Sequence, residues 1–208
     1  NPIMNILNMV MDYFWQDRRE NDFEGAFTKK VGLIYPELGF FVNQEALEDN
    51  NFINKKYIGM PEEESTSLAK EAFENYLEEL QNNGIETEVF NQSVKAADSV
   101  FPDWFTTARN STLPNGVLII SSMKTHERRK ERMEDTINEL SLRYEDVIDL
   151  SVYEKQHKFL ELKGALVTDW ENGKIYCNIS ERASEDVFDY MIEELNRIAA
   201  KTGEGKIR

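Results

Sequence analysis

The stretch that decides the fold begins SVFPDWFTTA at Ser99 to Ala108 and continues with VLIIS at Val117 to Ser121. Both runs are rich in β-branched and aromatic residues, and Pro114-Asn115-Gly116 between them is typical of a hairpin turn. The charged run from His126 to Tyr144 predicts a helix, and Val147 to Tyr153 predicts a further strand. The order strand, strand, helix, strand defines one structural unit.

The same order recurs on both sides of this unit. On the N-terminal side, a helix is expected from Ser65 to the stop signal Asn83-Gly84, and on the C-terminal side from Ser184 to Lys201. The flanking strands are predicted at Val31–Tyr35, Ile85–Phe90, Phe159–Asp169 and, after the turn Glu171-Asn172-Gly173, Lys174–Ile179. The first unit lacks a clear second strand and the last lacks a closing strand. The sequence therefore predicts an α/β fold of about three repeated units.

The net charge and composition of the chain limit the classes of molecule that it could bind. The chain has 208 residues, a formal net charge of −15 and 40% hydrophobic residues, which is enough apolar material for the core of one domain. Affinity for nucleic acid depends on Lys and Arg contacting phosphates, so a strongly acidic chain is a poor candidate. No apolar run approaches the ~20 residues that span a bilayer. We expect no nucleic-acid partner and no membrane span.

Cysteine and histidine are scarce. Cys177 is the single cysteine, and His126 and His157 are the only histidines. One cysteine excludes an internal disulfide and a thiolate metal cluster, and two histidines leave few candidate ligands for zinc. We expect neither a metal nor a cofactor. The lack of an internal disulfide favours an intracellular location, cytoplasmic or mitochondrial, over secretion.

Residues 1–25 are predicted to form an N-terminal arm with its linker, followed by an α/β domain at residues 26–208, because the connection from Gln16 to Gly25 is charged and without periodicity. The arm reads as an amphipathic helix, and its apolar positions are Ile3, Leu7, Val10, Met11 and Phe14. Two interpretations stay open. The helix packs on its own domain, or it docks into a groove of a partner protein, where methionine gives an adaptable contact.

Four segments in order resemble the guanidino-group-modifying superfamily, which includes amidinotransferases, arginine deiminases and dimethylarginine dimethylaminohydrolases. The resemblance is to its bacterial-type amidinotransferase-like branch, and it covers most of Val31 to Arg182. The segments are Gly39–Phe52, similar to an early loop; Asp98–Phe105, similar to D-S-V-F-P-N-N-W; Met123–Arg132, similar to M-x-x-x-N-R-R-x-E-R; and Phe159–Val167 with Ile175–Arg182, similar to F-L-E-G-x-G-S-L-V and A-Y-A-C-L-S-x-R.

The resemblance implies a pentein fold, an α/β propeller of five strand-strand-helix-strand units, of which this chain would form a part. The superfamily holds the guanidinium of its substrate with carboxylates and attacks its central carbon with a cysteine assisted by a histidine. Asp103 and Glu161 match guanidinium-facing acids. The third motif is matched by three arginines, which could hold an acidic substrate group or another segment: Arg128, Arg129 and Arg132.

The motifs also depart from the pattern. The second motif is one residue short at Asp103, which reverses the direction of later side chains unless a bulge absorbs the change. Leu162 stands where the fourth motif has a glycine. Cys177 matches a non-catalytic cysteine, and neither His126 nor His157 has the context of the catalytic histidine. No catalytic residue is therefore assigned.

Each candidate also has a structural interpretation. Asp103 would be a turn or edge residue, and Glu161 would pair with Lys163 or with an arginine of a neighbouring unit. The three arginines would form a salt-linked helix face with the surrounding acids Glu127, Glu131, Glu134 and Asp135. The acidic stretch Pro61 to Glu64 is expected to be a solvated loop.

Two functions follow from the sequence. The first is a catalytically silent, amidinotransferase-like subunit that acts as a scaffold or interaction module. Its partners would be other protein subunits or a second copy covering exposed strand edges, with the arm as docking element. The alternative is a fragment of an active enzyme for arginine-like substrates, with its catalytic His and Cys outside this chain. A third hypothesis is a non-catalytic binder of guanidino compounds that uses Asp103 and Glu161.

Overall fold

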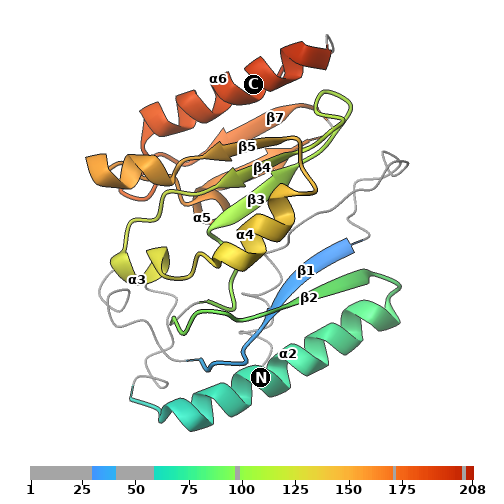
Figure 1. The fold of residues 1–208 in the computed structure, drawn as a ribbon, viewed down its shortest axis with the longest axis vertical. Helices are drawn as coiled ribbons and strands as arrows, with labels where there is room; N and C mark the ends of the chain where they lie inside the picture. The colour runs from blue at the N-terminus through green and yellow to red at the C-terminus, as the bar shows by residue number, and fades with distance from the viewer. Residues whose placement is uncertain (1–29, 41–58, 97–98, 171, 203–204) are drawn as a thin grey trace.

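The computed structural model describes residues 30–40, 59–96, 99–170, 172–202 and 205–208. They form an α/β fold with a parallel pair β1-β2, a three-stranded sheet β3-β4-β5 and an antiparallel pair β6-β7 (Figure 1). The strands are β1 (Lys30–Tyr35), β2 (Glu86–Asn91), β3 (Phe105–Ala108), β4 (Val117–Ile120), β5 (Asp146–Asp149), β6 (Leu166–Asp169) and β7 (Lys174–Cys177). The α/β class is confirmed, whereas closure of the sheets into a propeller is not seen in these ranges.

The middle unit has the predicted order. β3 pairs antiparallel to β4, and β4 pairs parallel to β5. The single helix predicted from His126 to Tyr144 is wrong, because the chain forms two short helices, α3 (His126–Arg129) and α4 (Glu134–Ser141). Between them, the N–H of Glu131 donates to the carbonyl of Arg128 three residues back, at 3.2 Å. This tighter turn directs Glu131 and Met133 into the interior, where both are buried.

Several of the predicted strands are shorter than expected. The strand from Ser99 starts only at Phe105, because residues before it form a turn in which the N–H of Asp103 donates to the carbonyl of Phe101 at 2.7 Å. The strand expected up to Tyr153 ends at Asp149 and is followed by a 3₁₀ helix, η2 (Ser151–Gln156). The strand expected over Phe159–Asp169 is interrupted by the short helix α5 (Leu162–Ala165), and the one expected to reach Ile179 ends at Cys177.

The first unit is built around α2 (Glu62–Asn82), which connects β1 to β2. The prediction of a loop at Pro61 to Glu64 is wrong, because Pro61 is the N-cap and the glutamates form the first turn, where carboxylates favour the helix dipole. Ser65, predicted to open the helix, is buried instead and donates to the carbonyl of Phe40 at 2.6 Å. The helix is capped at its C-terminus by Asn83, and Gly84 follows at φ +74°, in agreement with the predicted stop at Asn83-Gly84.

The third unit continues beyond α6 (Glu185–Thr202). No strand follows α6 in the described residues, in agreement with the prediction, but the last residue makes backbone hydrogen bonds to the β6-β7 pair. The N–H of Arg208 donates to the carbonyl of Gly173, and the N–H of Ile175 donates to the carbonyl of Arg208, both at 2.9 Å. Arg208 therefore lies next to β7, in the same way that β5 lies next to β4 in the middle unit. Ile207 before it is fully buried.

The core has three parts, ordered between α2 at one end of the molecule and α6 at the other (Figure 1). The first lies between α2 and β1, with Val31, Leu33, Tyr76 and Leu80. The second joins the first sheet, α4 and the middle sheet, with Ile34, Phe90, Leu118 and Leu140 among its members. The third joins the middle sheet, α6 and the β6-β7 pair, with Ile119, Ile148, Ile175 and Met191 among its members.

None of the helices in the described ranges has the length and apolar composition to cross a bilayer. The predicted docking positions Ile3, Leu7, Val10, Met11 and Phe14 lie outside the described residues, as do the boundary near Gln16 to Gly25 and most of the loop motif that begins at Gly39.

Candidate functional site

A cluster of buried charges lies where β3, α3, η2 and α5 meet. Its first element is Asp103, which is buried in the turn before β3. Arg128 donates from Nη2 to Asp103 Oδ2 at 2.6 Å and from Nε to Glu131 Oε1 at 3.0 Å. Glu131 is fully buried. One guanidinium group is therefore held by two carboxylates, an arrangement of strong, charge-assisted hydrogen bonds.

The backbone positions Arg128 for this contact. Thr125 is the N-cap of α3, and its hydroxyl accepts from the N–H of Arg128 at 3.4 Å. The tight turn after α3 then brings Glu131 onto the same side as Arg128. The sequence run R-R-K-E thus forms an ion pair at a spacing of three residues inside the protein, rather than on a solvated helix face.

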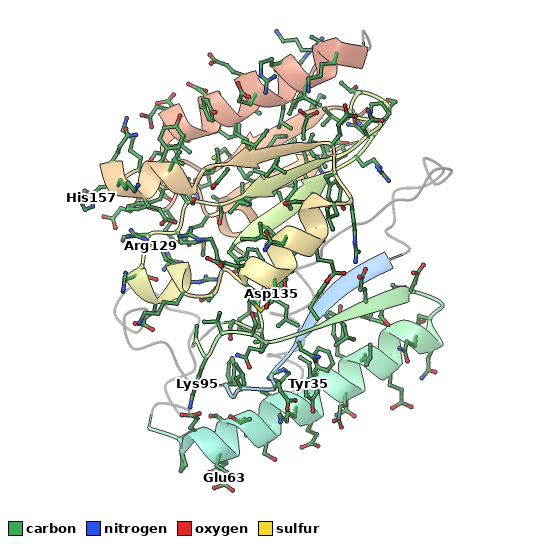
Figure 2. All side chains as sticks on the ribbon, viewed as in Figure 1. Tyr35, Glu63, Lys95, Arg129, Asp135 and His157 are labelled. Atoms are coloured by element: carbon green, nitrogen blue, oxygen red, sulfur yellow. The ribbon has the colours of Figure 1, made fainter. Side chains whose placement is uncertain are left out.

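The second element is Glu154 of η2. Arg132 donates to both of its carboxylate oxygens, with Nη2 at 2.9 Å from Oε2, and the N–H of Met123 donates to Oε1 at 2.8 Å. Arg129 Nε lies 3.5 Å from Glu154 Oε2 and donates to the carbonyl of Met123 at 2.9 Å. Figure 2 shows Arg129 on the side of α3 that faces η2. These two arginines fasten the segment after β4 to η2.

The third element is Glu161, which is buried immediately before α5. Its Oε1 accepts from the N–H of Lys124 at 2.9 Å, and its Oε2 lies 3.8 Å from Arg182 Nη1. The backbone N–H of Glu161 also donates to the carbonyl of Arg182 at 2.9 Å. Glu161 therefore links the middle unit, through the N–H of Lys124, to the third unit. The arginine that it contacts, Arg182, belongs to its own unit and not to a neighbouring one, so this contact matches neither of the two structural alternatives for Glu161.

The fourth element is Lys163, whose amine is buried and finds no hydrogen-bond acceptor among the described residues. Its Nζ lies 5.5 Å from the centre of the Phe105 ring, and α5 packs against β3 there. Burial lowers the pKa of Lys163 to about 8, although the negative charge of Asp103 acts in the opposite direction. Lys163 thus lies in the field of Asp103, not in an ion pair with Glu161.

The predicted residues are brought together only in part. Asp103 and Arg128 are in direct contact, and Lys163 joins them electrostatically. Arg129 and Arg132 both contact the carboxylate of Glu154, whereas the carboxylate of Glu161 contacts Arg182 instead. Sequence reasoning assigned no role to Glu154, which directly follows the strand predicted to end at Tyr153, and treated Glu131 as a surface acid. Glu154 opens the polar run that follows this strand, and nothing in that run distinguishes it from its neighbours.

Comparison with known proteins identifies the family. The model of a family described as N,N dimethylarginine dimethylhydrolase, eukaryotic, matches residues 37–202, which is more than half of the chain. The chain belongs to this dimethylhydrolase family. A search of curated proteins found no match.

A solved structure supports the same fold. It is a dimethylarginine dimethylaminohydrolase in which a histidine is replaced by glycine, as an adduct with S-methyl-L-thiocitrulline. The TM-score is 0.53 at 19% sequence identity, and the match covers 86% of this chain and 60% of that one. This dimethylhydrolase family member therefore spans about 60% of the length of the solved relative.

Three residues bear on the chemistry of this dimethylhydrolase family member. Cys177 lies in β7, half-buried, and burial raises the pKa of its thiol, which keeps it protonated and weakly nucleophilic at neutral pH. His126 opens α3, and His157 lies at the outer end of η2 (Figure 2). Within the described ranges, no group of three His, Cys, Asp or Glu side chains is arranged to hold a metal ion.

Proposed function

We propose that the chain is a non-catalytic member of the dimethylhydrolase family that acts as an interaction module in a larger assembly. The observation that carries this proposal is the hydrogen bond from Arg128 Nη2 to Asp103 Oδ2 at 2.6 Å. The motif resemblance assigns to Asp103 the task of holding a substrate guanidinium. In this chain, that carboxylate binds a guanidinium of the protein itself.

The charge balance of the cluster supports the proposal. Four buried carboxylates, on Asp103, Glu131, Glu154 and Glu161, face positive charges of the protein itself. These charges are Arg128, Arg129, Arg132, Lys163 and Arg182. A substrate cation would have to displace one of these groups. Leaving a buried charge without its partner costs about 3 to 5 kcal/mol, so the cluster favours a structural role over substrate binding.

A surface for a partner is offered by α2. It carries seven glutamates with exposed side chains: Glu62, Glu63, Glu64, Glu71, Glu74, Glu78 and Glu79. We propose that the three units are part of an incomplete propeller and that a basic protein surface binds this helix. The cytoplasm or the mitochondrial matrix remains the proposed compartment.

The second candidate is part of an active guanidino-group hydrolase or amidinotransferase. The observation that favours it is coverage, since the chain spans 60% of the solved dimethylarginine dimethylaminohydrolase. In that case the catalytic histidine and cysteine come from residues outside this chain, and Asp103 and Glu161 bind the substrate after Arg128 and Arg182 move away.

Calorimetric titration of the full chain with L-arginine and with N,N-dimethylarginine tests the proposal, together with an assay for citrulline. We expect no heat at millimolar ligand and no citrulline. Citrulline formation would establish the active enzyme. Heat without product would establish a guanidino-compound binder and remove the interaction module as the primary function.

A further inference from the structure

Three Asn-Gly pairs lie at turns of the chain, away from the cluster of buried charges. They are Asn83-Gly84 at the end of α2, Asn115-Gly116 in the β3-β4 hairpin and Asn172-Gly173 between β6 and β7. All three asparagines are exposed. An asparagine that precedes glycine loses its side-chain ammonia most readily, because glycine has no Cβ to obstruct the approach of its nitrogen to the side chain. The three turns are therefore candidate modification sites.

The reaction is an attack of a backbone nitrogen on the preceding side chain. The amide nitrogen of the glycine gives up its proton and bonds to Cγ of the asparagine, which closes a succinimide ring. The bond from Cγ to the side-chain nitrogen breaks, and this nitrogen takes up the proton and leaves as ammonia. Water then opens the ring at either of its carbonyl carbons, which gives aspartate or isoaspartate. A hydrogen bond from the glycine N–H to a carbonyl has to break before the attack.

Two of the three glycine nitrogens are held by such hydrogen bonds. The N–H of Gly84 donates to the carbonyl of Gln81, and the N–H of Gly116 donates to the carbonyl of Leu113, both at 3.0 Å. Packing restrains the second nitrogen further, since a Cβ on Gly116 would lie 2.8 Å from Cδ1 of Tyr144, whereas a Cβ on Gly84 would meet nothing within 4 Å. Both turns must open locally before they react, and the hairpin turn must also move against a side chain.

The third glycine nitrogen differs from these two. Within the described ranges, the N–H of Gly173 donates to no acceptor, although its carbonyl accepts from the N–H of Arg208 at 2.9 Å. Gly173 is buried, and a buried N–H without an acceptor is unfavourable in the folded chain. Ring closure replaces this N–H with a bond to carbon and so removes the unsatisfied donor. The nitrogen that attacks Asn172 is therefore available without the loss of a hydrogen bond.

Asp169 faces the amide group that this reaction removes. Its Oδ1 accepts from the N–H of Asn172 at 3.1 Å, and its Oδ2 accepts from the side-chain amide of Asn172 at 2.8 Å. The side-chain hydrogen bond, followed by the backbone one, holds the pKa of Asp169 below its ordinary value, so this carboxyl group is charged at neutral pH. Deamidation replaces the donor with a second carboxylate, and like charges would then face each other across the turn.

We propose that Asn172 is a site of spontaneous deamidation, and that its product weakens the turn between β6 and β7 by placing a carboxylate beside Asp169. The reaction consumes only water and releases only ammonia. It is selective for one of three Asn-Gly pairs because the fold leaves one glycine N–H without an acceptor. The modification is independent of whether the chain is catalytic.

Timed incubation of the full chain in mildly alkaline buffer, followed by peptide mass spectrometry, tests the selectivity. In the folded chain, we expect Asn172 to react about tenfold faster than Asn83, because Asn83 reacts only after a hydrogen bond has broken. Asn115 should be the slowest, since its glycine is also packed. The same incubation in urea is the control, and the three pairs should then react at similar rates. Equal rates in the folded chain, or a lead of Asn172 that persists in urea, would overturn the proposal.

A pair of backgrounds tests the consequence of the modification. Asn172→Asp reproduces the aspartate product and is expected to lower the melting temperature of the full chain. In an Asp169→Ser background, the same substitution meets no opposing carboxylate and is expected to lower the melting temperature less. An equal decrease in both backgrounds, or no decrease in either, would overturn the effect assigned to Asp169.

Discussion

Arg128 Nη2 lies 2.6 Å from Asp103 Oδ2, and the two side chains are 14% and 6% exposed. The contact joins the helix α3 to the turn before β3, and the same guanidinium binds Glu131 through Nε. A buried ion pair contributes little net stability compared with an apolar pair of the same shape, but removing one partner is costly. The consequences of this asymmetry can be measured.

Arg128→Met is expected to lower the free energy of unfolding by about 3 to 5 kcal/mol, because it leaves the carboxylates of Asp103 and Glu131 buried without this cation. Asp103→Asn is expected to cost less, about 1 to 3 kcal/mol, because Arg128 keeps Glu131 and the amide oxygen still accepts. Urea unfolding measures both values.

The control for this pair is Arg197→Met. Arg197 contacts Glu194 at 2.6 Å, but its side chain is 58% exposed, so water screens the interaction. We therefore expect Arg197→Met to change the free energy of unfolding far less than Arg128→Met. If Arg128→Met lowered the free energy of unfolding no more than Arg197→Met does, the buried cluster would not stabilise the fold in the way described.

Because the amine of Lys163 is buried, we expect the free energy of unfolding to depend on pH. Burial lowers the pKa of Lys163 in the folded chain to about 8, below its ordinary value of 10.5. Between these two values, the unfolded chain binds one more proton than the folded chain, so the contribution of Lys163 to stability increases as the pH rises. The slope is at most about 1.4 kcal/mol per pH unit.

The measurement is urea unfolding of the wild type and Lys163→Met between pH 7 and pH 9.5. Other groups that titrate in this range are present in both proteins, so the difference between the two free energies isolates Lys163. We expect this difference to shift in favour of the wild type as the pH rises. A difference that stays constant with pH would show that the folded amine has an ordinary pKa.

The chain end provides a prediction about the third unit. Ile207 is fully buried, and its N–H and carbonyl both bind the amide side chain of Asn196, each at 2.9 Å. Ile207→Ala is therefore expected to lower the unfolding free energy by about 2 to 5 kcal/mol, as for other buried isoleucines. Ile179→Ala is the control, since Ile179 is exposed, and thermal unfolding should hardly change. Equal effects would mean that residues 207–208 do not pack beside β7.

The order of elements could be predicted from the sequence because it depends on local periodicity. The hairpin at Gly116, the stop at Gly84 and the amphipathic pattern of α6 are properties of short windows, and all three are present in the structure. Contacts between segments that are far apart in the sequence could not be predicted from such short windows. The break between α3 and α4 places Glu131 and Met133 in the interior, where Met133 packs in one cluster with Ile34 and Phe90 of the first unit, and no local pattern indicates this.

For the same reason, the contacts within the candidate site could be predicted only in part from the sequence. Motif resemblance singled out Asp103 and the arginines, but it could not assign their partners, since Arg128 binds Asp103 across 25 positions and Arg132 binds Glu154 across 22. Lys163 was considered only as a partner for Glu161, because its relation to Asp103 depends on α5 packing against β3. Pairing over such distances is set by the packing of whole units.

The last prediction tests whether Arg128 takes the place of a substrate cation. Arg128→Ala removes the guanidinium while leaving Asp103 and Glu131 in position, so a small guanidinium ion should bind in the vacated space. We expect 10 mM methylguanidinium to raise the melting temperature of Arg128→Ala by several degrees and to leave the wild type unchanged. Methylammonium, which has the same charge but lacks the planar fork, controls for ionic strength and should have a smaller effect. If the two ions stabilised Arg128→Ala equally, the site would recognise charge alone, and the idea that it is a guanidinium site occupied by the chain's own arginine would be wrong.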